Sequence, residues 1–303
     1  MMSPAFAGDI AFITNQSSND VSVVDIDKAE VLATIDVGGQ PAAVAVSPDG
    51  EIAYVVSPET KTVSMIYTGD FSVRHQFTLD GGPFGIAVHP DNERIYVADW
   101  YGARVFELSA TGTLLRELQT GASPSGLAVT PDGTRLVTAD RDSNQISIIS
   151  LETGQLIAAV PVGERPFGVT LDAAGRLAYT ADVGSNTVSV VDLMHQTKVA
   201  EIPTGERPYE VALARGKGFV TDQYHDTLTV FDLLTRKVLG TVAIGEYPEG
   251  IETTSDGGHV VVANWFSNTI TVVDTETLEI TAEIKVGDGP RAFGAFLLPE
   301  VID

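Results

Sequence analysis

Seven prolines recur along the chain at an almost constant interval, and this interval constrains the fold more than any other feature of the sequence. Each proline follows a glycine by two or three residues, and neighbouring members lie 40 to 42 residues apart: Pro41, Pro83, Pro124, Pro166, Pro208, Pro248 and Pro290. Self-similarity at a period near 40 is the signature of a stacked or radial array of repeats. The chain is therefore expected to fold as repeated units and not as two unrelated domains.

One unit, between residues 165 and 199, shows what each repeat contains. Alternating or β-branched segments at 166–171, 177–181, 187–192 and 198–202 predict four short strands. Turn-forming residues separate them, as in Asp172-Ala173-Ala174-Gly175 after the first strand. Four locally connected strands make one antiparallel, twisted sheet, and the sequence predicts no helix.

The two ends of the chain complement each other. Residues 10–38 contain the last three strands of a unit, and residues 290–296 contain a first strand with nothing after it. Joined, they would make a seventh sheet and close a ring, whereas a solenoid would need capped ends. We predict an all-β, seven-bladed β-propeller with four antiparallel strands per blade, formed by residues 8–298 as one domain, with residues 299–303 as a tail.

Two motifs inside the repeat resemble those of a known family. The segments Phe12-Ile13-Thr14-Asn15, Tyr96-Val97-Ala98-Asp99, Tyr179-Thr180-Ala181-Asp182 and Val261-Val262-Ala263-Asn264 resemble the YVTN repeat, and runs such as 185–192 and 267–274 continue the pattern. The resemblance covers residues 8–298 and concerns the repeat. It implies a β-propeller similar to the exported bacterial members associated with quinoprotein-dependent catabolism. The Gly-His and Trp-Asp signatures of WD40 blades are absent.

Composition excludes several classes of function. The net charge of −23 repels phosphate backbones, so we expect neither nucleic acid nor an anionic membrane as a partner. No apolar run is long enough to span a membrane, and the absence of cysteine excludes disulfides and thiolate chemistry. We expect a monomer whose partner is a small molecule or another exported protein.

The first seven residues bear on location. Ala5-Phe6-Ala7 before Gly8 fits the small-x-small pattern of a signal-peptidase site, without the basic and apolar regions that precede such a site. Residues 1–7 are therefore either the tail of a secretory signal or an ordinary Ala-rich terminus. We expect a periplasmic or secreted protein.

Strand alternation places two connections of every blade on one face, which we call the Pro/Asx face. These are the fourth-to-first connection, with its proline, and the second-to-third connection, with its Asx and Ser-Asn residues. Aromatic and arginine side chains gather there, and such groups suit a flat or anionic ligand or an interface. The candidate binding residues are Trp100, Tyr101, Arg141, Arg165, Phe167, Arg207, Tyr209, Tyr224, Glu249, Trp265 and Arg291. The alternative is that these side chains only cover blade ends and pair with local carboxylates.

Catalytic and metal signals are sparse. His225, flanked by Asp222 and Tyr224, is the best general-base candidate, although a solvated loop histidine is the commoner case. His89 occupies a turn position and is expected to be structural. Residues 140–144 space three oxygen ligands as D-x-D-x-N but lack the glycine and distal glutamate of a calcium loop. We therefore expect no metal and no cofactor.

Two hypotheses follow. The first is a binding or accessory propeller that uses the Pro/Asx face. The second is a lyase or hydrolase built around His225 and the arginines of the same face. A deep pocket where Tyr224, His225 and an arginine converge would favour the enzyme, and a shallow aromatic face would favour binding.

Overall fold

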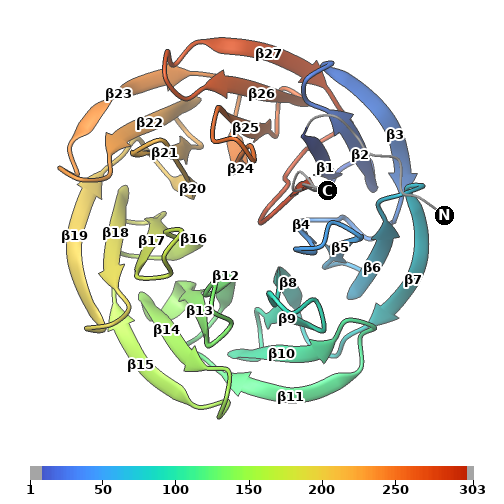
Figure 1. The fold of residues 1–303 in the computed structure, drawn as a ribbon, viewed down its shortest axis with the longest axis vertical. Coiled ribbons are helices and arrows are strands. Elements are labelled where there is room, and N and C mark those ends of the chain that lie inside the picture. The colour runs from blue at the N-terminus through green and yellow to red at the C-terminus, as the bar shows by residue number, and fades with distance from the viewer. Residues whose placement is uncertain (1–8, 299–303) are drawn as a thin grey trace.

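The chain forms a closed ring of seven four-stranded antiparallel sheets around a central channel, which confirms the predicted seven-bladed propeller (Figure 1). The computed structural model describes residues 9–298. Within these residues the only helical element is one 3₁₀ turn, η1 (Arg141–Ser143), and no helix is long and apolar enough to cross a membrane.

Six blades are continuous in sequence, and each runs outward from the channel in chain order. The first two are β4 (Ala43–Val46), β5 (Ile52–Ser57), β6 (Thr62–Tyr67) and β7 (Ser72–Thr78), then β8 (Pro83–Val88), β9 (Arg94–Asp99), β10 (Arg104–Ser109) and β11 (Leu114–Gln119). The next two are β12 (Pro124–Val129), β13 (Arg135–Asp140), β14 (Gln145–Ser150) and β15 (Leu156–Pro161), then β16 (Pro166–Leu171), β17 (Leu177–Asp182), β18 (Thr187–Asp192) and β19 (Thr197–Pro203). The last two are β20 (Pro208–Ala214), β21 (Lys217–Asp222), β22 (Thr227–Asp232) and β23 (Val238–Ala243), then β24 (Pro248–Thr253), β25 (His259–Asn264), β26 (Thr269–Asp274) and β27 (Ile280–Lys285).

The remaining blade joins the two ends of the chain, as predicted. It pairs β28 (Leu297–Leu298) with β1 (Ile10–Asn15), β2 (Asp20–Asp25) and β3 (Glu30–Asp36). The closing segment is less regular than the strand expected at 290–296, because Ala292 and Gly294 have positive φ angles of 46° and 107°. Regular pairing begins only at Leu297, where Glu252 on β24 accepts the N–H groups of Phe296 and Leu297, both at 2.6 Å.

Side-chain patterns explain why each blade packs as it does. The second and third strands are buried along most of their length, as in β17 and β18, whereas fourth strands such as β19 are mostly exposed and bury only Ile202. The inner turns close on glycine: Gly50 at φ 72° and Gly133 at φ 69° adopt the left-handed conformation that other residues disfavour. Local sequence therefore determines both the strands and the turns.

An Asx side chain also fixes five of the seven connections between blades, whereas Lys61 and Ala103 occupy this position in the other two. Asn144, Asn186 and Asn268 accept the backbone N–H of Arg165, Arg207 and Gly289 at 2.8, 3.0 and 2.9 Å, each 21 residues further along the chain. The accepting residue precedes the third strand of one blade, and the donor precedes the first strand of the next. These bonds hold the residues of the Pro/Asx face in place.

Candidate functional site

The strand registers place both predicted connections on one face. Pro166 pairs with Asp182, Asp182 with Thr187, and Thr187 with Pro203, so the proline and Asx ends of the blade coincide. The same arrangement recurs around the ring, for example where Pro83 pairs with Asp99. The Pro/Asx face is thus one surface built by equivalent connections of successive blades.

Aromatic rings fill the centre of the channel beneath this face. Phe167 lies at the centre of these rings. Its ring centroid is 4.5 Å from that of Tyr209, 5.1 Å from that of Phe293 and 5.6 Å from that of Phe84. Trp100 closes the set by packing on Phe84 at 5.2 Å. Phe167, Tyr209 and Phe293 are nearly fully buried. The aromatic cluster (Phe84, Trp100, Phe167, Tyr209 and Phe293) therefore fills the channel beneath the Pro/Asx face.

A buried polar group lies beside the aromatic cluster. The Arg291 guanidinium donates to the Tyr209 hydroxyl at 2.8 Å and lies 3.0 Å from the Glu249 carboxylate. Gln223 donates to the other oxygen of Glu249 at 3.0 Å, and Gln16 accepts from Arg291 at 3.2 Å. Burial raises the pKa of Glu249, and the adjacent Arg291 acts in the opposite direction. The charge of Arg291 is thus compensated within the protein.

A second arginine remains without a carboxylate partner. Arg207 donates to the Tyr224 hydroxyl at 2.6 Å, and its guanidinium lies 4.6 Å from the centre of the Tyr224 ring. The Tyr247 ring packs between Tyr224, at 5.8 Å, and Phe266, at 5.0 Å. Tyr224 and Phe266 are 51% and 63% exposed. This row of rings offers open aromatic surface next to a cation.

Three buried polar atoms of this region accept or donate no hydrogen bond within the described residues. They are Arg207 Nε, Gln223 Oε1 and Glu249 Oε2, the last of which makes its ion pair with Arg291. Buried polar groups are normally hydrogen-bonded, and unsatisfied ones in a native protein point to a missing water or ligand. Gln223 is joined to Glu249 by a hydrogen bond, and the positive charge of Arg207 lowers the pKa of Glu249 without a direct contact between the two.

The backbone beneath this region adopts a costly conformation. Arg165, Arg207 and Tyr247, each just before a proline, have φ angles of 54°, 57° and 56°, whereas the last blade places Gly289 there at 63°. Non-glycine residues in this region cost free energy. Gln40 and Ser123 hold the same position at φ 55° and 54°, so this conformation belongs to the repeat and is not peculiar to the candidate site. The chain keeps large side chains at positions where glycine would be unstrained.

The structure brings together only part of the predicted set. Tyr209, Glu249, Arg291 and Trp265 meet, since the Arg291 guanidinium also lies 5.8 Å from the Trp265 ring. Phe167 and Trp100 belong to the aromatic cluster, and Arg207 and Tyr224 contact each other. Three predicted residues make no contact with the Arg291 group. Tyr101 is 85% exposed and Arg165 is also exposed. Arg141 pairs with Asp142 at 2.5 Å and stacks on Trp100.

The catalytic candidates do not form a dyad. His225 is exposed; its Nδ1 accepts the backbone N–H of Glu206 at 3.3 Å, and its Nε2 lies 4.0 Å from the Glu206 carboxylate. Asp222 is buried and accepts from Thr229 at 2.7 Å and Thr227 at 3.1 Å. Burial raises the pKa of Asp222 to about 6. Among the described residues, no hydrogen bond joins the His225 side chain to that of Asp222 or Tyr224; only the His225 backbone N–H donates, to the Asp222 carbonyl at 3.3 Å.

Sequence reasoning did not select Gln223, Tyr247, Phe266 and Phe293 as site residues. The first three occupy the same repeat positions as selected residues, so a stricter position-by-position comparison of repeats would have found them. Phe293 could not be found in this way, because its place in the channel depends on the irregular closing segment.

The D-x-D-x-N segment is occupied by structural contacts. Asp140 accepts hydroxyl donors from Ser147 at 2.5 Å and Thr138 at 2.6 Å, and Asp142 accepts from Ser123 at 2.7 Å. Within residues 9–298, no three His, Cys, Asp or Glu side chains are grouped so as to hold a metal ion.

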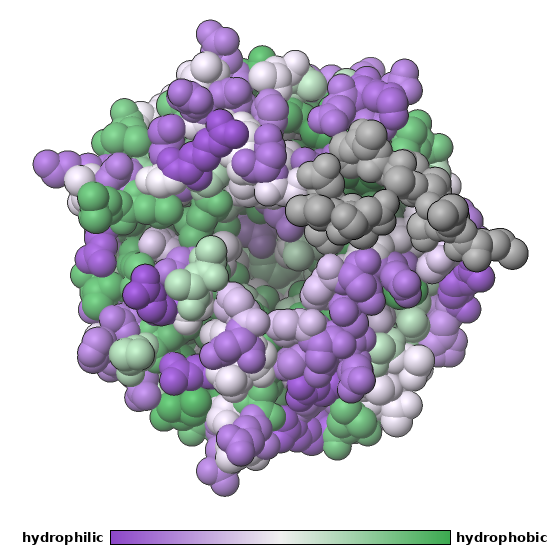
Figure 2. Space-filling model, viewed as in Figure 1, coloured by the Kyte–Doolittle hydropathy of each residue, from purple (hydrophilic) through white to green (hydrophobic). Residues whose placement is uncertain are grey.

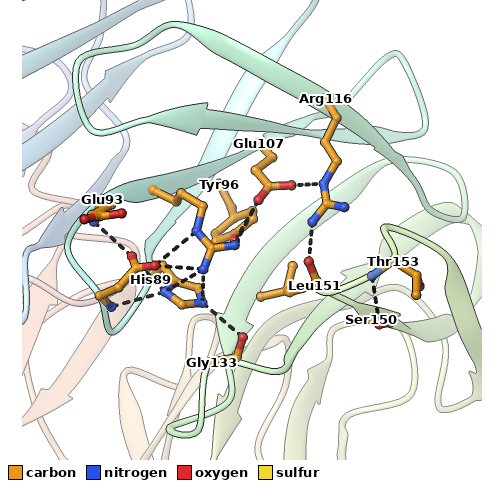
Figure 3. Close-up of polar contacts among 11 residues, drawn as sticks. His89, Glu93, Tyr96, Glu107, Arg116, Gly133, Ser150, Leu151 and Thr153 are labelled. Carbon is orange, nitrogen blue, oxygen red and sulfur yellow. Dashed lines mark hydrogen bonds and ion pairs between the residues drawn. The ribbon is translucent and has the colours of Figure 1, made fainter.

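A second polar cluster lies away from the channel and joins two blades (Figure 3). Glu107 is 2% exposed and is held by Arg94 and the Tyr96 hydroxyl, both at 3.3 Å, and by Arg116. His89 approaches the Gly133 carbonyl of the next blade at 3.0 Å, and Arg116 donates to the Leu151 carbonyl. These groups have internal partners, so the cluster is structural, in agreement with the expectation for His89.

The fold and its channel define the class of protein: a seven-bladed β-propeller with an aromatic-floored face. Solved structures with this fold include hydrazine synthase of Kuenenia stuttgartiensis (TM-score 0.79, 21% identity, 88% of this chain and 92% of the other). A second is the dihydro-haem d1 dehydrogenase NirN, solved in complex with DHE (TM-score 0.73, 16% identity, 96% of this chain and 76% of the other). A third is a protein of unknown function from Desulfotomaculum acetoxidans DSM 771 (TM-score 0.80, 15% identity, 94% of this chain and 97% of the other).

These likenesses establish the architecture. No family model matches the chain, and no curated protein matches it. The YVTN family assignment therefore stays a prediction from the repeat motifs.

Proposed function

We propose that this protein is a binding propeller whose Pro/Asx face holds a planar, anionic ligand beside Arg207. The observation that carries the proposal is the buried Nε of Arg207, which has no hydrogen-bond acceptor among the described residues although its side chain is stacked on Tyr224. A guanidinium with an unused donor next to an aromatic face suits an anionic group on a flat ring system.

The charge distribution supports an anion at this point in spite of the net charge of −23. Of the four arginines predicted as candidates on the face, Arg291 and Arg141 are paired with Glu249 and Asp142. Arg207 and Arg165 make no ion pair within residues 9–298. Local positive charge in an acidic molecule steers an anion to one place.

The exposed rings of Tyr224 and Phe266 and the half-buried rings of Tyr247 and Trp265 supply the flat contact surface. Tyr224, Tyr247 and Phe266 form a continuous row, and the Trp265 ring lies 5.8 Å from the Arg291 guanidinium. Aromatic rings contribute binding free energy through area and offset stacking. The NirN complex has only 16% identity to this chain, so it supports the fold and does not assign the ligand.

A protein partner is the second candidate, and Tyr101 favours it. This side chain is 85% exposed on the Pro/Asx face, outside the Arg207 region. Exposed tyrosine is typical of interface hot spots. A small ligand at Arg207 would not reach Tyr101, so Tyr101→Ala would weaken only a protein complex.

The enzymatic alternative requires His225 to reach a ligand together with Tyr224 or an arginine. In the structure the Tyr224 hydroxyl accepts a hydrogen bond from Arg207, while the exposed His225 imidazole accepts one from the Glu206 backbone. This geometry favours binding over the enzymatic alternative.

Binding can be tested with fluorescein, a planar dianion, and with rhodamine 6G, a cation on the same ring system, by fluorescence anisotropy. We expect fluorescein to bind more tightly, and Arg207→Ala and Trp265→Ala to weaken it by about 1–3 kcal/mol each. The melting temperature should change little, as for most surface substitutions.

Arg236→Ala is the matched control. Arg236 also has a positive φ, of 60°, and also donates through Nη1 to an oxygen, the Val199 carbonyl, but at a third-to-fourth connection on the opposite face. It should leave fluorescein affinity unchanged. If Arg207→Ala and Trp265→Ala lower stability without affecting affinity, these side chains serve packing and the proposal is wrong.

We also propose that the protein is exported. The basis is the Ala5-Phe6-Ala7 pattern, which lies outside the described residues, together with the resemblance to exported propellers.

A further inference from the structure

The opposite end of the channel contains a cavity of about 670 Å³, visible as the central hollow in Figure 2. It lies between the inner strands, and Phe293 of the aromatic cluster lines it. Its walls are small and apolar, because four blades place alanine at the same repeat position: Ala45, Ala87, Ala128 and Ala212. A volume of this size is typical of sites for small molecules.

Two glutamates interrupt the apolar wall. Glu210 occupies the repeat position where Gly85, Gly126, Gly168 and Gly250 stand in other blades, and Glu252 occupies the alanine position. Long acidic side chains replace the smallest residues at two places in the same cavity. The repeat requires neither of them, since the other blades form without them.

Hydrogen bonds fix the direction of both carboxylates. Glu210 Oε2 accepts the backbone N–H of Ile251 at 3.3 Å, and Glu252 Oε2 accepts from Phe296 and Leu297. Within the described residues, no hydrogen bond reaches Glu252 Oε1. An ionised carboxylate has about four acceptor positions, so capacity remains on the cavity side.

No lysine or arginine in residues 9–298 forms an ion pair with Glu210 or Glu252. Arg215, at the cavity wall, instead lies 3.7 Å from Glu276. Burial raises the pKa of Glu252 to about 8, with a smaller contribution from Asp9, and raises that of Glu210 well above its usual value. The neutral form of both groups is therefore favoured while no cation is near, and a cation that reaches them would compensate the cost of their ionised form.

We propose that this cavity binds an organic cation: an ammonium group held by Glu210 and Glu252, with an apolar body against the alanine wall. A divalent metal ion fits less well, because calcium takes six to eight oxygen ligands and no group of three ligand side chains exists in the described part of the chain. The site is separate from the Pro/Asx face and independent of the function proposed there.

The experiment compares phenethylammonium with 2-phenylethanol and 3-phenylpropionate by isothermal titration calorimetry. The three share a phenyl group and differ in charge. We expect the ammonium to bind about tenfold or more tighter than the alcohol, and the carboxylate not to bind. Equal affinity for ammonium and alcohol, or no binding of the ammonium at millimolar concentration, would overturn the proposal.

Variants locate the binding site. Glu210→Gln should lower the affinity for phenethylammonium about tenfold. Ala128→Leu, which fills the cavity, should abolish binding. Glu283→Gln, an exposed carboxylate on the outer strand β27, is the matched control and should change nothing. Unchanged affinity in Glu210→Gln or in Ala128→Leu would overturn the proposal. Glu252→Gln is less suitable because Glu252 also holds the closing segment.

Discussion

The Nε atom of Arg291 lies 3.0 Å from the carboxylate of Glu249, and both side chains are largely buried, at 17% and 5% exposed. Arg291 belongs to the closing segment and Glu249 to β24, so this ion pair joins the end of the chain to the neighbouring blade. The same arginine bonds to Tyr209, 82 residues earlier in the chain. The Arg291 side chain thus joins the segment that closes the ring to the candidate site.

Removing one member of this pair should be costly, because it leaves the other charge buried and unpaired. We expect Arg291→Ala or Glu249→Ala to lower the free energy of unfolding by about 3–5 kcal/mol, and the double variant to lose less than the sum. Urea denaturation measures all three. Arg141→Ala, whose partner Asp142 is 47% exposed, should cost no more than about 1 kcal/mol. Equal losses for Arg291→Ala and Arg141→Ala would contradict the interpretation.

The closing segment depends on a glycine. Gly294 has a φ of 107°, and a Cβ there would lie 2.6 Å from the carbonyl oxygen of Val44. We expect Gly294→Val to lower the free energy of unfolding by about 2 kcal/mol or more. Gly240→Ala is the control, since a Cβ at Gly240 meets nothing within 4 Å and its φ is not positive. If both variants have the same stability, the segment does not need the glycine conformation.

Deleting residues 290–303 removes the inner strand of the seventh blade and exposes two sheet edges, one on β1 and one on β4. Unpaired edges promote aggregation. We expect severe destabilisation or aggregation, measured by differential scanning calorimetry and light scattering. A truncated protein that stays soluble and melts within about 2 °C of the full chain would show that the C-terminal segment does not close the ring, since even ~1 kcal/mol shifts Tm by a few degrees.

Asp182 predicts a pH dependence of stability. Burial raises its pKa from 3.8 to about 6, while hydroxyl donors such as Ser189 and Thr180 oppose the shift. Between pH 4 and 6 the folded state therefore holds a proton that the unfolded state has lost. Stability should fall as pH rises through this window, by roughly 3 kcal/mol from this group, and its contribution should level off above pH 6.

Asp182→Asn isolates that contribution. Asn15 and Asn264 occupy the equivalent position in two other blades, so asparagine is compatible with the fold. Urea denaturation at pH 4, 5, 6 and 7 should give a flatter stability profile for the variant than for the parent. Identical slopes would show that Asp182 stays ionised throughout.

Export predicts a defined amino terminus. If Ala5-Phe6-Ala7 ends a signal sequence, the natural gene encodes a basic, apolar segment upstream, and the mature protein begins near Gly8. Mass spectrometry of the protein from a periplasmic extract measures this directly. A cytoplasmic protein that begins at Met1 or Met2 would refute the proposal.

Several parts of the fold were predictable because they depend on local sequence. The period of the prolines gave the seven blades, and turn residues such as Gly50 and Gly133 marked where strands end. The closing segment was harder: residues 290–296 alternate like a strand, yet Gly294 takes a left-handed conformation to pass the Val44 carbonyl. The candidate face was predictable from strand alternation. Which of its arginines form an ion pair and which do not was not predictable.

The sequence by itself determined the number of blades, their strand order and the face on which each connection lies, because repeats, alternation and turn chemistry act over a few residues. Only the tertiary structure decided what the channel contains. Arg291 meets Tyr209 across 82 residues, and Glu210 and Glu252 share a cavity with alanines from four blades, only once the ring is closed. Burial and charge compensation at the axis depend on all the blades together, and no local pattern encodes them.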